Sequence, residues 1–198
     1  SNGRKEEFKQ HVARTFDLFM IAVIPVIVGA QIVSTNLTVL IAGSEFETSG
    51  PVLALLTLAL LGVFMGALYG HLVVALNKQK IMTLGYVAVA IVAITGYLWL
   101  IPDYGMWGAV WVTLVSEALI AGLTFMVVYK TSGALPNLMV TFKALVSAGI
   151  MSLALQAMPS THVVITILAG VLVYTASLFA LKAIKLSEIK SMLAKPTL

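Results

Sequence analysis

The stretch of sequence that decides the fold class runs from residue 52 to residue 76 and reads VLALLTLALLGVFMGALYGHLVVAL. It contains no Lys, Arg, Asp or Glu. A helix of about 20 apolar residues crosses the roughly 30 Å hydrocarbon core of a bilayer, because each residue adds about 1.5 Å. This stretch therefore predicts a transmembrane helix.

Apolar stretches of similar length lie on both sides of it. The six predicted helices lie near residues 16–42, 52–76, 81–101, 106–129, 139–158 and 163–181. Gly, Pro, Asn and Asp residues separate them, as is typical of turns. The runs are too long for the strands of a membrane barrel. We expect an all-α, polytopic membrane protein with a cytoplasmic linker at 1–15, a transmembrane domain at 16–181 and a cytoplasmic tail at 182–198.

The composition excludes a soluble domain. Hydrophobic residues make up 60% of the chain and charged residues only 10%, whereas soluble domains average about 45–50% and about 25%. Without cysteine there is no disulfide and no thiolate metal site. No catalytic or nucleotide-binding motif is present, and the three histidines fall in different segments. We therefore expect no enzyme activity, no metal and no cofactor.

The charged residues predict the orientation in the membrane. If the six helices alternate, all 12 Lys and Arg residues fall on one side. The links on the other side carry Glu45, Glu47 and Asp103 and no basic residue. Because Lys and Arg are retained in the cytoplasm, we expect a multi-pass protein of the cell membrane with both ends of this chain cytoplasmic. The net charge of +4 then reflects basic residues gathered on the cytoplasmic side of a lipid bilayer. The bilayer is therefore the expected partner, and nucleic acid is not.

Polar residues form a stripe on the first predicted helix. The stripe has the spacing i, i+3, i+4, i+7 and consists of Gln31, Ser34, Thr35 and Thr38. Pro25, about two turns earlier, removes a backbone hydrogen bond and predicts a hinge. The stripe faces either a water-filled substrate pathway or a neighbouring helix with which it shares hydrogen bonds. The sequence leaves both open.

Glycines at four-residue spacing mark one face of the second predicted helix. Gly62, Gly66 and Gly70 form a small-xxx-small ridge, which lets a neighbouring backbone approach closely. We interpret the ridge as a packing surface. His71 follows it and is either a hydrogen-bonded interface group or a proton relay.

Glu117 is the one acidic residue deep inside a predicted span. It lies about 16 Å along the helix that starts near residue 106, which is close to the membrane midplane. Thr113 and Thr124 share its stripe, at i−4 and i+7. A carboxyl group that binds and releases a proton or cation is what ion-coupled transport requires, and the alternative is a carboxyl that fixes helix packing.

Lys143 begins the fifth predicted span. Its long side chain can reach the cytoplasmic headgroups as an ordinary anchor. The alternative is a cation that binds the phosphate of an anionic lipid carrier.

Two motifs resemble those of a known family. Residues 75–80 read ALNKQK, and residues 100–117 fit the pattern LIPxYGxxGAxxxTLxSE, followed by Tyr129-Lys130. The start, residues 3–8 (GRKEEF), and Ala42-Gly43 with Phe46 add to the likeness. In order and spacing these residues resemble the lipid-linked oligosaccharide flippases of the multidrug/oligosaccharidyl-lipid/polysaccharide exporter superfamily.

The resemblance implies a transporter for polysaccharide biosynthesis. The chain would form most of the C-terminal lobe of a two-lobe flippase fold, and the missing N-terminal helices of the same protein would be its partner. The substrate would be a lipid-linked glycan, carried from the inner to the outer leaflet and driven by a cation gradient. Glu117, Thr113, the first-helix stripe, Lys143 and His71 are the candidate pathway residues.

Other functions remain open. A peptidoglycan-precursor flippase or a drug/cation antiporter of the same superfamily shares these features. A non-transporting part of a membrane glycan polymerase or ligase complex is more remote, because the predicted outer links are too short for a catalytic domain.

Overall fold

The structure is a computed structural model. It describes residues 2–133, 135–158 and 162–183, with side chains from residue 6 onward. The elements in chain order are α1 (Asn2–Ala42), the 3₁₀ helix η1 (Ser44–Ser49), α2 (Gly50–Ala75), α3 (Gln79–Tyr104), α4 (Met106–Ser132), α5 (Met139–Ala157) and α6 (Val163–Ala180).

The helices have the length and composition of membrane spans. In the described ranges, six helical segments of 18 residues or more are apolar enough to cross a bilayer, and no strand occurs there. At about 1.5 Å per residue, 18 residues cover about 27 Å. The predicted all-α class and the six membrane-length helices are confirmed, and they indicate a multi-pass membrane protein.

The largest difference from the predicted boundaries is at the start of α1. The helix begins at Asn2 and not near residue 16, so the predicted linker 1–15 is helical from residue 2. Lys9 and Glu6 form an exposed i,i+3 ion pair at 3.2 Å. Val12 and Phe16 repeat every four residues and are buried, so this segment is an amphipathic extension of the span. At the other end, α6 ends at Ala180, and the predicted tail lies outside the described residues from 184 onward.

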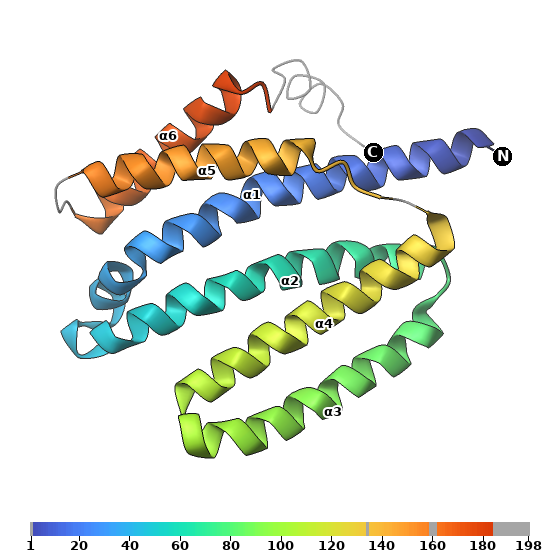
Figure 1. The fold of residues 1–198 in the computed structure, drawn as a ribbon, viewed down its shortest axis with the longest axis horizontal. Coiled ribbons are helices and arrows are strands. Elements are labelled where there is room, and N and C mark those ends of the chain that lie inside the picture. Colours follow the sequence, from blue (N-terminus) through green and yellow to red (C-terminus); the bar gives the residue numbers. More distant parts are fainter. Residues whose placement is uncertain (1, 134, 159–161, 184–198) are drawn as a thin grey trace.

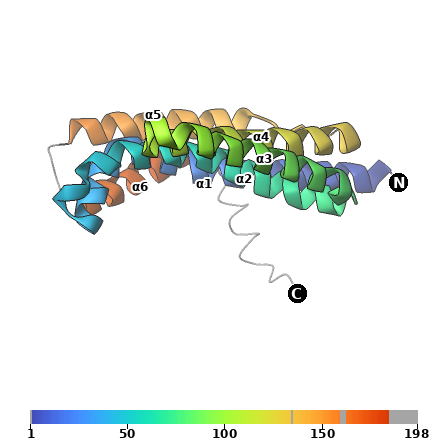
Figure 2. The same ribbon diagram turned by 90° about the horizontal axis from the view of Figure 1, so that it is seen from below.

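The helices form a flattened row and not a closed bundle. From one edge to the other the order is α3, α4, α2, α1, and then the pair α5 and α6 (Figure 1). Seen edge-on the molecule is a thin, staggered slab (Figure 2). Although α2 and α3 are consecutive in sequence, α3 packs mainly on α4. The centre of the row is α1, which contacts α2 on one side and α5 and α6 on the other.

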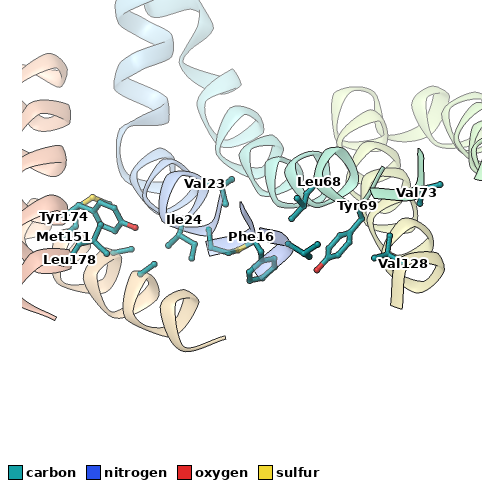
Figure 3. Packing of buried hydrophobic residues seen from close by; sticks show 14 of the residues in the cluster. Phe16, Val23, Ile24, Leu68, Tyr69, Val73, Val128, Met151, Tyr174 and Leu178 are labelled. Carbon is teal, nitrogen blue, oxygen red and sulfur yellow. The ribbon is translucent and has the colours of Figure 1, made fainter. Parts of the chain in front are cut away.

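A continuous cluster of buried side chains connects α1 with α2 and α4 in one direction and with α5 and α6 in the other (Figure 3). From α1 it includes Phe16, Met20, Val23 and Ile24. On one side it continues through Leu68, Tyr69 and Val73 of α2 to Val128 of α4, and on the other side through Met151 of α5 to Tyr174 and Leu178 of α6.

The two ends of the molecule differ in charge. The N-terminus and the α2–α3 and α4–α5 links lie at one end, where Lys78, Lys80 and Lys130 are found (Figure 1). We call this the basic end. The opposite end carries η1 and the α3–α4 turn, with Glu45, Glu47 and Asp103, and we call it the acidic end.

A tight turn joins α3 and α4 at the acidic end. Gly105 has φ +55° and ψ −131°, a conformation that residues with a Cβ rarely adopt. A Cβ at Gly108 would lie 2.5 Å from the Leu100 carbonyl oxygen, so both glycines are required for this hairpin.

Candidate functional site

Glu117 lies near the middle of α4, on the side that packs against α2. The contact is unusually close: a Cβ at Gly62 would lie 2.8 Å from Glu117 Cβ and 3.0 Å from the Glu117 carbonyl oxygen. Because Gly62 is near the middle of α2, the two helices meet backbone to backbone at the level of the carboxyl group. The absence of a side chain at Gly62 therefore makes this arrangement possible.

A cavity of about 360 Å³ adjoins this contact. Its lining comes from α2 and α4 and consists of Leu58, Ala59, Leu61, Gly62, Met65, Leu114, Glu117, Ala118 and Ala121. Glu117 is the one ionisable residue in that lining. Among the described residues no hydrogen-bond donor and no cation pairs with its half-buried carboxylate. The carboxyl group is therefore available to a proton, a cation or water.

Thr113 does not join Glu117 at this cavity. Its hydroxyl donates to the Ala109 carbonyl at 2.9 Å and lies 3.0 Å from the Tyr97 hydroxyl of α3. Since the Thr113 proton is used within its own helix, Tyr97 is the donor of the second bond. Thr113 is thus turned toward α3 while Glu117 is turned toward α2. Thr124, fully buried, donates to the Ile120 carbonyl of its own helix at 2.8 Å.

Two of the four residues in the polar stripe of α1 contact α2. Gln31 Nε2 donates to the Ala54 carbonyl of α2 at 2.9 Å and lies 3.3 Å from Thr57 Oγ1. Thr35 of α1 packs against the first residue of α2, since a Cβ on Gly50 would be 2.5 Å from Thr35 Cα. Both residues therefore belong to the α1–α2 contact.

The other two residues of the stripe do not bond across helices. Thr38 donates to the Ser34 carbonyl of its own helix at 2.7 Å. Ser34 is buried and lines a second cavity, of about 410 Å³. We call it the α1–α6 cavity, because α1 and α6 supply most of its lining, with Thr57 of α2 and Met151 and Leu155 of α5 among the rest. The stripe contains both a residue with an interhelical hydrogen bond, Gln31, and a residue that lines a cavity, Ser34.

The glycine ridge of α2 faces two helices. Like Gly62, Gly66 is turned toward α4, where a Cβ would lie 3.1 Å from Ile120 Cγ2. Gly70 is turned toward α3, with Tyr86 Oη at 3.3 Å from a Cβ. His71, next in sequence, has an exposed side chain.

Lys143 is half-buried at the start of α5. Its ammonium group donates to the Lys182 carbonyl at 3.2 Å, just beyond the end of α6. The last carbonyls of a helix lack intrahelical partners and carry partial negative charge, so a cation is favourable there. In this structure Lys143 joins the basic ends of α5 and α6.

Pro25 lies inside α1, which continues through it. Proline has no N–H, so the Ile21 carbonyl loses its i+4 donor. The Tyr174 hydroxyl of α6 donates to this carbonyl at 2.9 Å. Tyr174 and the cross-helix partners Thr57 and Tyr97 were missed by sequence reasoning, and the one signal for Tyr174 is a hydroxyl in the middle of an apolar span.

Within the described residues, no three His, Cys, Asp or Glu side chains come together in a way that would hold a metal ion.

Comparison with known proteins adds no assignment. A scan against protein-family models finds no match, and searches of curated proteins and of solved structures find none.

Proposed function

We propose that this chain is the C-terminal part of a transporter that moves a lipid-linked oligosaccharide from the inner to the outer leaflet, coupled to a proton or cation. The observation that carries the proposal is the Glu117 carboxyl, which lines a cavity of about 360 Å³ between α2 and α4. The resemblance of residues 100–117 to the flippase pattern supplies the substrate class.

The charge of Glu117 provides the coupling. An ionised carboxylate at the centre of a span costs about 2.5–3.5 kcal/mol on insertion scales. A bound proton or cation removes that charge. Because Glu117 packs directly on the Gly62 backbone, its charge state alters the stability of the α2–α4 contact. A ligand that binds one state of this contact better shifts the equilibrium between inward-open and outward-open forms.

The orientation follows from the two ends of the molecule. Because Lys and Arg are retained in the cytoplasm, the basic end faces the cytoplasm and the acidic end faces outward, in the cell membrane. A cysteine at Ser44, in η1, should react with an impermeant maleimide on intact cells, and a cysteine at Thr131, at the end of α4, should not. Labelling at Thr131 would reverse the proposed orientation.

The partner is a second helical lobe of the same protein. An open row of helices does not enclose a pathway for a glycan, and in this proposal a second lobe, formed by N-terminal helices of the same protein, lies beside it in the membrane and faces it across the pathway. A drug/cation antiporter is the second candidate, and the apolar lining around Glu117 favours it, since such a cavity suits an apolar cation.

The decisive experiment replaces Glu117 by Gln in the full-length protein. Glu117→Gln keeps the shape and the hydrogen-bonding capacity of the side chain but removes its titration. It should abolish complementation of a strain lacking its glycan flippase at an unchanged protein level. Glu47→Gln, an exposed carboxylate of η1, is the matched control and should complement fully.

The alternatives give different outcomes in the same series. Full complementation by Glu117→Gln would leave this residue a packing group and overturn the proposed coupling. The substrate would be a peptidoglycan precursor if the wild-type protein rescued a strain depleted of its peptidoglycan-precursor flippase. It would be a drug or other cation if the protein gave Glu117-dependent drug resistance without complementing the strain that lacks its glycan flippase.

A further inference from the structure

The hydrogen bond between Tyr174 and Ile21 repairs a defect that Pro25 creates. In an α-helix the amide of residue 25 would bond to the carbonyl of residue 21, and proline has no amide proton. Inside a bilayer no water replaces the missing donor, so the freed carbonyl needs another protein group. The Tyr174 hydroxyl, 153 positions away in the sequence, supplies it at 2.9 Å.

Tyr174 is held firmly in this position. The residue is only 6% exposed, and its ring lies beside Met151 and Leu178, with the hydroxyl directed toward α1 (Figure 3). Its hydroxyl donates to the α1 carbonyl that loses its amide partner because residue 25 is proline. The bond therefore ties the middle of α6 to the one weak point in the backbone of α1.

The two sides of that point are packed differently. On the side toward the basic end, Phe16, Met20 and Val23 belong to the buried cluster. On the other side, Pro25, Gly29 and Ser34 line the α1–α6 cavity of about 410 Å³. A Cβ at Gly29 would find its nearest heavy atom at 3.9 Å, the Met151 Cε. The segment of α1 beyond Pro25 thus has free space beside it. Figure 1 shows the last part of α1 leaving the direction of its first part.

We propose that the Tyr174–Ile21 hydrogen bond is a latch that fixes the bend of α1, and that its release lets the segment beyond Pro25 move into the α1–α6 cavity. Tyr174 is a positioning residue in this device. The moving segment carries Gln31, which bonds to Ala54 of α2. A change in the bend is therefore passed to α2, the helix that packs against Glu117.

A double-mutant cycle isolates the latch. Tyr174→Phe removes the hydroxyl and keeps the ring, while Pro25→Ala returns an amide proton to position 25. With Pro25 present, Tyr174→Phe leaves the Ile21 carbonyl unpaired and should lower the melting temperature of the full-length protein by about 2–4 °C, the shift expected for one hydrogen bond. In the Pro25→Ala background the same change should have less than half that effect. Equal shifts in the two backgrounds would overturn the latch.

A distance measurement separates a latch from a merely stabilising contact. Residues 1–198 contain no cysteine, so cysteines introduced there carry spin labels at defined positions once any cysteine elsewhere in the protein has been replaced. One pair, at Ile41 of α1 and Val164 of α6, reports on the acidic end, and a control pair at His11 and Phe179 reports on the basic end. All four side chains are exposed.

Tyr174→Phe should broaden or shift the distance distribution of the pair at Ile41 and Val164 and leave the control pair unchanged. Unchanged distributions for both pairs in folded protein would overturn the proposal. If Tyr174→Phe does not fold, recovery of folded protein in the double variant Pro25→Ala/Tyr174→Phe supports the latch, and no recovery overturns it. None of these outcomes depends on the substrate, so they are independent of the Glu117 test.

Discussion

Two contacts in this molecule are built in opposite ways. Where α2 meets α4, glycines bring the backbones together around a single carboxyl group, and a Cβ at Gly62 would be only 2.8 Å from Glu117 Cβ. Where α1 meets α6, a cavity of about 410 Å³ lies beside the packed part of the contact, and a hydrogen bond from Tyr174 crosses between the two helices.

The difference indicates that a conformational change can begin at the α2–α4 contact and that the α1–α6 contact has the space to accommodate it. At Gly62 the backbones of α2 and α4 have no room to move closer, so a change of size at this point acts on the contact directly, although a cavity of about 360 Å³ adjoins it. The α1–α6 contact has room for movement beside its cavity, and the bond from Tyr174 to Ile21 lies at the edge of that space. In a transporter the first kind suits a sensor for a bound proton or cation, and the second suits a hinge.

The largest effect should come from Gly62→Leu. The new side chain would meet the Glu117 Cβ and backbone and force α2 and α4 apart, at a cost of about 1–3 kcal/mol or more. Expression level and melting temperature in detergent measure it. Gly122→Leu, at a position on α4 where a Cβ would have no neighbour within 4 Å, is the control and should be near neutral. Similar melting temperatures for the two variants would contradict a close α2–α4 contact.

Gly66→Leu should have an intermediate effect. A Cβ here would be 3.1 Å from the end of the Ile120 side chain, which can change rotamer, whereas Gly62 faces backbone. We expect a loss of stability smaller than that of Gly62→Leu, measured by the same melting experiment. If Gly66→Leu proved the more damaging of the two, the closest approach of α2 and α4 would lie nearer the basic end than Gly62.

Gly170→Ala should have the smallest effect. Its Cβ would lie 3.3 Å from Leu155 Cδ1 and 3.6 Å from Met151 Sδ, both near the ends of flexible side chains beside the α1–α6 cavity. Alanine also favours a helix by about 1 kcal/mol over glycine, so the melting temperature should stay the same or rise slightly. A clear fall, comparable to that of Gly66→Leu, would mean that α6 packs as tightly as α4 and has no room to accommodate a moving α1.

Much of the helix content was predictable, because a span needs only length and apolar residues. The start of α1 was not, since residues 6–15 are too polar for a span. They continue the helix through good helix formers and the buried face of Val12 and Phe16. The order of helices in the row was not predictable either, because it depends on which small residues meet across the chain.

The sequence predicts individual residues of the candidate site, but it does not predict which residues of other helices they contact. Glu117 is conspicuous because a carboxyl is costly in a span, but its partner Gly62 was interpreted only as part of a ridge. Thr113 shares the stripe of Glu117, yet α4 lies between two helices, and Thr113 bonds to α3 while Glu117 packs on α2. Tyr174 gains its role only from a proline in another helix.

The motif that supports the flippase resemblance has two parts with different meanings. Gly105 and Gly108 are required by the geometry of the α3–α4 hairpin, so any tight turn of this shape would favour glycine at those positions. Turn geometry does not explain Ser116-Glu117. The second part of the motif is therefore the more informative about function.

The thinness of the slab has a consequence for how the sequence can vary. In none of the six candidate spans is more than 28% of the most apolar window buried, and in α3 the share is 6%. Residues that face lipid need only be apolar and of any shape, so most positions should accept exchange among Leu, Ile, Val, Phe and Met. Selection on shape would then act on narrow lines of small residues between helices. In a saturation mutagenesis experiment, positions such as Gly50, Gly62 and Gly66 should reject larger side chains, while most other positions of the same helices accept them.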